Sequence, residues 1–274
     1  PESKDRSSDG KRFDVIGIIV FVIMMVSVNV VITQGSKIGW LSPTILTLMI
    51  IFVLTLFIFY FYEQRQRHPF IDFSLFSNKV YIGTTIANLL VNTVIGSLAL
   101  FNIFAQAGLG LTGAQAGLIT IPYMLGSLLM IRIGERFMQK KGPQIPLMAG
   151  PISISVGILL LALNFLPHIL YYIIALIGFS FIGLGLGFFA TPALSTAVSN
   201  APESKVGMAS GIIKMTSTLG AAFGIAVVTT VYSTLEINHT PHMAATIALI
   251  VGACMVISAF IVAFLVIPKQ HVKA

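Results

Sequence analysis

The chain has 274 residues, of which 56% are hydrophobic and only 9% are charged, well below the roughly 25% charged residues of a typical soluble domain. That composition excludes a water-soluble fold, and a single cysteine, Cys254, excludes an internal disulfide framework. The net charge of +7 would suit nucleic-acid binding if the basic residues formed one patch on a folded domain. The basic residues instead lie between apolar runs, so we expect the lipid bilayer as partner and no nucleic acid.

Eight long apolar runs follow a polar, charged N-terminal stretch. Each is close to or above the roughly 20 residues that a helix needs to cross the hydrocarbon core. The predicted spans are Val15–Ile32, Thr44–Tyr62, Tyr81–Ala105, Gln115–Ile133, Ile145–Phe165, Ile169–Val198, Met208–Tyr232 and Met243–Ile267. The runs are too long and too irregular for strands, so we predict an all-α integral membrane protein.

The runs divide the chain into five predicted parts. These are a cytoplasmic linker (1–12), a transmembrane hairpin of two spans (13–62), a cytoplasmic amphipathic connector (63–79), a C-terminal six-helix bundle (80–268) and a cytoplasmic tail (269–274). Because the first residue is Pro1 and not Met, we expect the sequence to begin partway through a longer chain.

The placement of Lys and Arg predicts the orientation. Of the 16 Lys and Arg residues, all but Lys37 and Lys214 fall on the side that holds the N-terminus. Cytoplasmic loops carry such an excess, so we predict a multi-pass plasma-membrane protein with both termini of this chain in the cytoplasm.

Few residues suggest reaction chemistry. The nine acidic residues all lie outside the spans or at their ends, whereas a pump usually carries its proton on an intramembrane carboxylate. Either the protein is not proton-driven, or its proton carrier lies upstream of this chain. Glu236, His239 and His242 could form a metal site or a plain polar loop; we predict no metal and no catalytic residue, and the sequence has no P-loop motif.

A polar stripe marks the third predicted span. Asn88, Asn92, Asn102 and Gln106 are spaced by 4, 10 and 4 residues, which places them within about 80° of one helix face, and Thr85 extends the stripe. Amides are costly in lipid, so this face must point into the bundle or a water-filled cavity. We predict substrate binding here; hydrogen bonding between helices is the structural alternative.

Two further features accompany the stripe. Tyr123, with Ser127 and Met130 on one face of the fourth span, could line the same cavity or simply pack in the core. Lys214, inside the seventh span, could extend to the headgroups or pair with an acid as a gate. Glycines four residues apart, which let helices approach closely, are predicted to serve packing or gating at Gly183, Gly187, Gly207, Gly211, Gly220 and Gly224.

Four stretches, taken in order, carry a resemblance to a known family. They are Lys11–Asp14 before the first span; His68–Phe73 with Leu75 and Phe76 before the third; Gly183, Gly185, Gly187 and Pro192 in the sixth; and Gly207, Ser210, Gly211, Gly220 and Gly224 in the seventh. The chain thereby resembles the C-terminal eight spans of the fourteen-span drug:proton antiporter branch of the major facilitator superfamily, most closely its Nor-type quinolone and multidrug exporters of Gram-positive bacteria.

The resemblance implies proton-driven export of amphipathic drugs by alternating access. The expected partners are small drug substrates, protons and an N-terminal six-helix bundle of the same protein, and the proton gradient replaces any cofactor. Gln139 stands where the family often has an acid, which argues against a charge-based latch near Arg136 and Gly142. The alternatives are a symporter for a small nutrient, or a membrane enzyme or scaffold; an enzyme would need buried acid–base groups.

Overall fold

The computed structural model describes residues 14–66 and 71–266. The predicted linker (1–12), the predicted tail (269–274) and parts of two motifs, Lys11–Phe13 and His68–Phe70, lie outside these residues. All regular secondary structure in the described residues is helical, and eight helical stretches there are long and apolar enough to cross a membrane. The predicted fold class and all eight predicted spans are confirmed.

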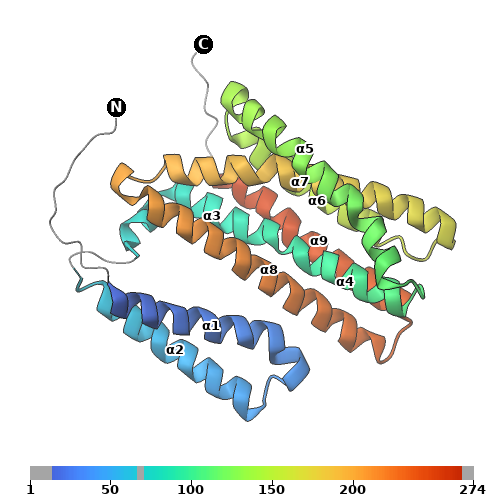
Figure 1. Ribbon diagram of the computed structural model, residues 1–274, viewed down its shortest axis with the longest axis horizontal. Coiled ribbons are helices and arrows are strands. Elements are labelled where there is room, and N and C mark those ends of the chain that lie inside the picture. Colours follow the sequence, from blue (N-terminus) through green and yellow to red (C-terminus); the bar gives the residue numbers. More distant parts are fainter. Residues whose placement is uncertain (1–13, 67–70, 267–274) are drawn as a thin grey trace.

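The helices follow one another with short connections (Figure 1). They are α1 (Val15–Ile38), α2 (Pro43–Glu63), α3 (Lys79–Asn92), α4 (Val94–Ala107), α5 (Gly113–Lys141), α6 (Gln144–Leu161), α7 (His168–Ser199), α8 (Val206–Glu236) and α9 (Pro241–Val266), with short 3₁₀ helices η1 (Phe73–Ser77) and η2 (Glu203–Lys205). Side-chain caps begin several of them: Asp14 caps α1, Ser42 caps α2 and Asn78 caps α3, each accepting a backbone N–H.

The third span is not one continuous helix, as the sequence analysis expected, but two helices that meet at Thr93. The Thr93 amide and hydroxyl both donate to the carbonyl of Leu90, at 3.2 and 2.6 Å, and the amide of Gly96 donates to the Thr93 carbonyl at 2.9 Å. These bonds reach back three residues instead of four and tighten the turn. Apolar periodicity carries no signal for such a local change.

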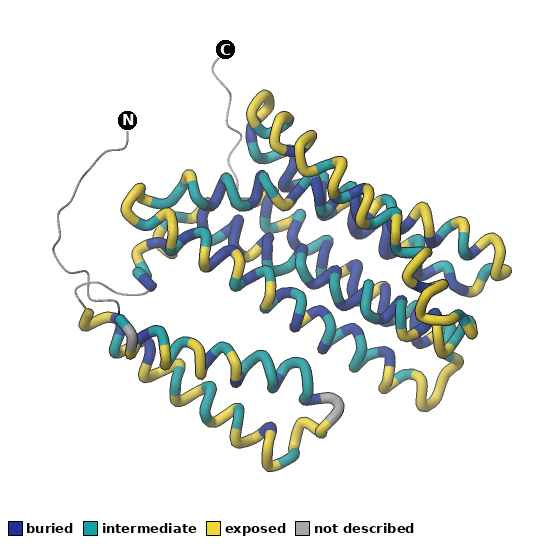
Figure 2. Tube along the Cα trace, viewed as in Figure 1, coloured by how far each residue is buried: buried dark blue, intermediate teal, exposed yellow. Residues whose placement is uncertain are grey.

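Helices α3 to α9 form the bundle, and the α1–α2 hairpin lies beside α8 (Figure 1). Buried residues run along the inside of the bundle, whereas α2 and α5 show mostly exposed residues (Figure 2). These exposed side chains are apolar, for example Leu54, Phe57, Leu128 and Leu129, which suits contact with lipid tails.

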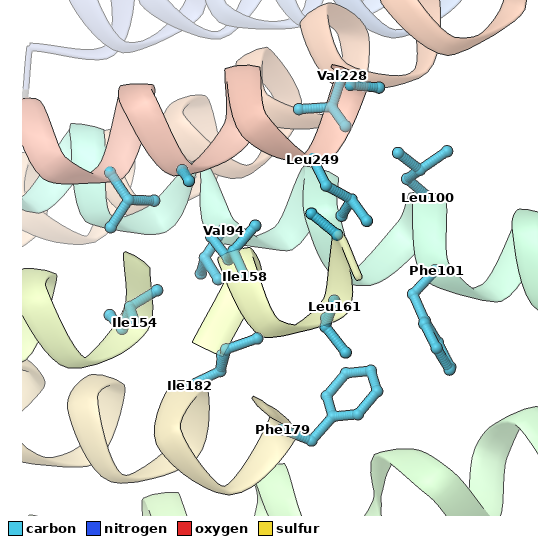
Figure 3. Packing of buried hydrophobic residues seen from close by; sticks show 14 of the residues in the cluster. Val94, Leu100, Phe101, Ile154, Ile158, Leu161, Phe179, Ile182, Val228 and Leu249 are labelled. Carbon is cyan, nitrogen blue, oxygen red and sulfur yellow. The ribbon is translucent and has the colours of Figure 1, made fainter. Parts of the chain in front are cut away.

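The main core cluster draws residues from every helix of the bundle, α3 to α9, and Figure 3 shows part of it. Phe101 and Phe179 meet edge to face with ring centroids 4.7 Å apart, a favoured aromatic geometry. Ile154, Ile158 and Leu249 are almost fully buried around them. Helices α3 and α4, which carry the polar stripe, both contribute residues to this core.

A second cluster joins the hairpin to the bundle at one end of the molecule. We call this the basic end, because helix ends and connections there carry Arg65, Lys79, Lys140, Lys141 and Lys205, and the C-terminal third of α5 adds Arg132 and Arg136. The second cluster consists of Met24, Phe59, Ile71, Leu75, Tyr81, Ala197, Ala209, Ile212 and Ile213. It draws on α1, α2, the connector, α3, α7 and α8, so the hairpin is packed onto the bundle through this end.

Polar contacts reinforce the same junction. Lys205 of η2 pairs with Asp72 just before η1 and also donates to the Ser74 hydroxyl at 2.7 Å. The Asn78 amide group donates to the carbonyl of Asn200 at 3.0 Å. The connector is therefore tied to the turn between α7 and α8.

Candidate functional site

Asn88 is committed to contacts between helices. It is only 5% exposed, and its Nδ2 donates to the carbonyl of Ile213 at 2.9 Å and to the hydroxyls of Thr216 and Ser217 at 3.1 and 2.8 Å. All three acceptors are on α8. This is the helix-to-helix alternative weighed for the polar stripe, so Asn88 contributes to the α3–α8 interface and has little left to offer a ligand.

The other three amides of the stripe are more accessible. Asn92 and Asn102 are partly exposed and Gln106 is exposed. Each amide nitrogen donates to the carbonyl four residues earlier: Asn92 to Asn88 at 2.8 Å, Asn102 to Leu98 at 3.0 Å, and Gln106 to Asn102 at 3.1 Å. These bonds fix the side chains along the helix, and an amide oxygen accepts through two lone pairs. The three residues thus present held acceptors on α3 and α4.

Tyr123 lies on α5, partly buried against the main core. Its hydroxyl makes no hydrogen bond to another described residue, whereas Ser127 donates its hydroxyl to the Met124 carbonyl at 2.9 Å. A phenol that is part buried and still unbonded is available to a ligand. Met130 is also partly exposed, one further turn along.

Four of the six singled-out glycines lie at close helix crossings. A Cβ on Gly183 or Gly187 of α7 would overlap the backbone of Tyr123 or Ser127 on α5. A Cβ on Gly220 or Gly224 of α8 would overlap the backbone carbonyls of Leu89 and Thr93, on the α3–α4 side. Since only a hydrogen fits at these points, α5 is packed directly onto α7 and α8 directly onto α3 and α4.

The remaining two glycines behave differently. A Cβ on Gly207 or Gly211 would meet no atom within 4 Å, so neither packs against another described helix. Lys214 is exposed on the same side of α8, since it follows Gly207 by seven residues and Gly211 by three. Its ammonium forms no ion pair or hydrogen bond with a described residue. Part of α8 near the basic end is therefore left uncovered.

The metal alternative at the other end of α8 finds no support in the geometry. Among the described residues, no three His, Cys, Asp or Glu side chains lie close enough to hold a metal ion. Glu236 accepts from the Tyr232 hydroxyl at 3.0 Å, and His242 lies 2.9 Å from the carbonyl of Asn164 with its ring against Phe104. The run of Glu236, His239 and His242 is divided among separate contacts.

The structure also shows an acidic pair that sequence reasoning left aside. Asp14 of α1 accepts from the Tyr62 hydroxyl at 3.1 Å, and Glu63, 2% exposed, accepts from the amide of Ile71. A Cβ on Gly17 would touch both carboxylates, so the two acids lie close together at the basic end of the hairpin. The sequence did contain a signal for this pair. Asp14 begins one span and Glu63 ends the next, and these two positions meet at the same end of a hairpin.

Comparisons with known proteins agree with this architecture. A family model described as Major Facilitator Superfamily matches residues 13–225. The chain is 44% identical over 271 residues to the Quinolone resistance protein NorB of Staphylococcus aureus strain bovine RF122 / ET3-1, and 43% identical over 271 residues to that of strain COL. Each alignment covers 99% of this chain but 58% of the relative, so the chain spans less than two thirds of the length of these relatives.

Proposed function

The chain belongs to the major facilitator superfamily, a family of multi-pass membrane transporters and not of enzymes, and from this premise we propose that it is the second part of a proton-driven exporter of amphipathic drugs. The relatives bear the name quinolone resistance protein, which supports quinolones as a first substrate class. We place the protein in a bacterial plasma membrane with both termini of this chain in the cytoplasm.

The observation that carries the proposal is the row of accessible amides on α3 and α4. Asn92, Asn102 and Gln106 are held by bonds to their own helix, on a span that is otherwise apolar. Ligand sites for such drugs are mostly apolar with a few placed polar groups. Tyr123 on α5, with its unbonded hydroxyl, is proposed as a further wall of the same site.

Alternating access needs a second helical bundle that moves against the bundle of this chain. We propose that the second bundle contacts this chain at the uncovered part of α8. A Cβ on Gly207 or Gly211 would meet no atom within 4 Å, whereas Gly220 and Gly224 on the same helix are in tight contact. Lys214 is exposed and has no ion pair or hydrogen bond to a described residue. We propose that an N-terminal six-helix bundle of the same protein covers this surface when the basic end is closed. The tight crossings at Gly183, Gly187, Gly220 and Gly224 would keep this chain's bundle together as it rocks.

Energy coupling is assigned to that other bundle. The described acids, Asp14, Glu63, Asp72, Glu135, Glu203 and Glu236, lie at helix ends or in connections. None sits at the middle of a span, where a proton carrier would have to exchange between the two sides. The proton-carrying residue is therefore proposed to lie in the part of the protein that this chain does not include.

Transport by the full-length protein in inside-out vesicles tests the proposal. A fluorescent quinolone should accumulate in energised vesicles, and a protonophore should abolish the accumulation. Asn102→Leu should change the apparent affinity by roughly two- to tenfold, since one hydrogen bond contributes about 0.5–1.5 kcal/mol. Accumulation that is indifferent to the proton gradient, or absent for every amphipathic drug tried, would refute the proposal.

A further inference from the structure

A groove runs along the outer face of α2 at the basic end. Its volume is about 560 Å³, and it is lined by Phe57, Ile58, Phe61, Tyr62, Arg65 and Gln66. That volume lies within the range of sites for small organic ligands, about 300–1,000 Å³. We propose that this groove binds one anionic phospholipid, with the phosphate at Arg65 and Gln66 and an acyl chain along Phe57, Ile58 and Phe61.

The lining of the groove changes from apolar to polar along α2, as a phospholipid changes from its acyl chains to its headgroup. Phe57, Ile58 and Phe61 are 58%, 53% and 58% exposed and lie within the span, at the depth of the acyl chains. Arg65 and Gln66 follow the last helical residue, Glu63, at the level of the headgroups. An apolar wall that ends in a cation and an amide matches an acyl chain that ends in a phosphate.

Charge complementarity selects an anionic headgroup. None of the described residues that line the groove is acidic, and Arg65 forms no ion pair or hydrogen bond with another described residue. A guanidinium binds phosphate oxygens in a bidentate manner. The Tyr62 hydroxyl donates to Asp14 and also contacts the Gln66 side chain, so Tyr62 contributes its ring to the wall. The phosphate is left to Arg65 and to the remaining amide hydrogen of Gln66.

No described helix covers this face. Helix α2 packs on α1, and α1 in turn packs on α8 of the bundle, so the bundle lies on the far side of α1 (Figure 1). The groove therefore opens toward the membrane, where phospholipid is the abundant amphipathic molecule. The inference rests on the chain crossing a bilayer and is independent of what the protein transports.

Tryptophan quenching by brominated lipids tests the inference at the groove itself. In full-length protein whose tryptophans, Trp40 included, are changed to Phe, Phe61→Trp supplies a single reporter. Reconstitution with brominated phosphatidylglycerol should quench this reporter at a lower lipid fraction than brominated phosphatidylcholine, by about fivefold in relative binding constant for one basic residue.

Two charge variants decide the outcome. Arg65→Gln in the reporter background should remove the preference for phosphatidylglycerol, because Arg65 is the only cation among the described residues that line the groove. Arg132→Gln, which removes the same charge from an exposed position on α5, on the other side of the bundle from α2 (Figure 1), should leave the preference intact. Equal quenching by both lipids in the parent, weak quenching by either, or a preference that survives Arg65→Gln would each overturn the proposal.

Discussion

Two asparagines one helical turn apart have different surroundings. Asn88 donates to three groups on α8, whereas Asn92 donates only to Asn88, at its carbonyl and its Oδ1. Both side chains would be costly to leave in lipid. Asn88 satisfies its hydrogen bonds across the α3–α8 interface. Asn92 satisfies its amide nitrogen within α3 and remains accessible.

Substitution by Leu should therefore separate the two kinds of residue. Asn88→Leu removes the bonds to α8 and should lower the folding stability by about 0.6–2 kcal/mol, so folded yield and transport should fall together for every drug. Asn102→Leu removes a bond within one helix, and folded yield should stay near the parent value while efflux shifts differently for different drugs. Folded yield by gel filtration and efflux of several drugs measure this; drug-selective loss in Asn88→Leu would contradict the assignment.

The sequence could identify the stripe but not divide it. Spacing along a helix predicts which residues share a face, and the cost of an amide in lipid predicts that this face avoids the lipid. Neither argument says whether Asn88 meets Thr216 and Ser217 or a cavity, because that depends on the rotation of α8 against α3. The sequence likewise does not distinguish Gly207 from Gly220, two glycines on one helix. A Cβ on Gly207 would meet open space, whereas one on Gly220 would overlap another helix.

At the scale of the helices, the crossing of α8 with α3 depends on the absence of a side chain. A Cβ on Gly220 would overlap the Leu89 carbonyl oxygen and lie 3.1 Å from the Cβ of Asn92. Gly220→Ala should therefore destabilise the protein by about 1–3 kcal/mol, as overpacking usually does, despite the better helix propensity of Ala.

Gly117→Ala on α5 is the matched control, since a Cβ there meets no atom within 4 Å. Thermal unfolding of both variants in detergent compares them. A melting temperature for Gly220→Ala that equals that of Gly117→Ala would show that the crossing is looser than described.

The contact between the connector and η2 is electrostatic and should depend on pH in a defined direction. The hydrogen bond from Lys205, followed by that from the Ser74 amide, lowers the pKa of Asp72 below its ordinary value of 3.8. A lowered carboxyl pKa adds stability at pH values above the ordinary one, and this stability is lost as the pH falls through the lowered value.

The difference in melting temperature between the parent and Asp72→Asn should accordingly be constant from about pH 5.5 to 8 and shrink only below about pH 4. Both partners are about one quarter exposed, so the difference should correspond to less than about 1 kcal/mol and diminish at high salt. Lys205→Gln should behave like Asp72→Asn. A difference that disappears between pH 5.5 and 7 would point to another titrating group.

The element pattern was largely predictable. Apolar runs of span length, with few charged residues, account for the eight crossings, because a helix satisfies all of its own backbone hydrogen bonds in lipid. The break at Thr93 was not predictable, since it depends on a hydroxyl turned back to Leu90 and on the carbonyl that faces Gly224. The contact of the hairpin with α8 was likewise not predictable. Apolar residues that face lipid and apolar residues that face another helix give the same sequence pattern.

For the whole molecule, the gathering of basic residues at one end predicts the topology. Cysteines introduced at Glu236 and at Lys140 lie at opposite ends of the bundle. In intact cells, a membrane-impermeant thiol reagent should label position 236 and leave position 140 unlabelled until the membrane is permeabilised, because the basic end should face the cytoplasm. Parent protein with Cys254→Ser serves as background. Labelling of position 140 from outside would reverse the proposed orientation.

The bonds from Asn88 also govern how the molecule is made. Its partner Ile213 follows it by 125 residues, and at roughly 5–20 residues per second the ribosome needs about 6–25 s to synthesise that stretch. Throughout this interval α3 has left the ribosome while α8 does not yet exist. The buried amide must meanwhile be sheltered by the insertion machinery, a chaperone or a temporary neighbour. The polar contacts of α3 are therefore completed only when α8 arrives, and a nascent chain that stalls before α8 should be a substrate for membrane proteases.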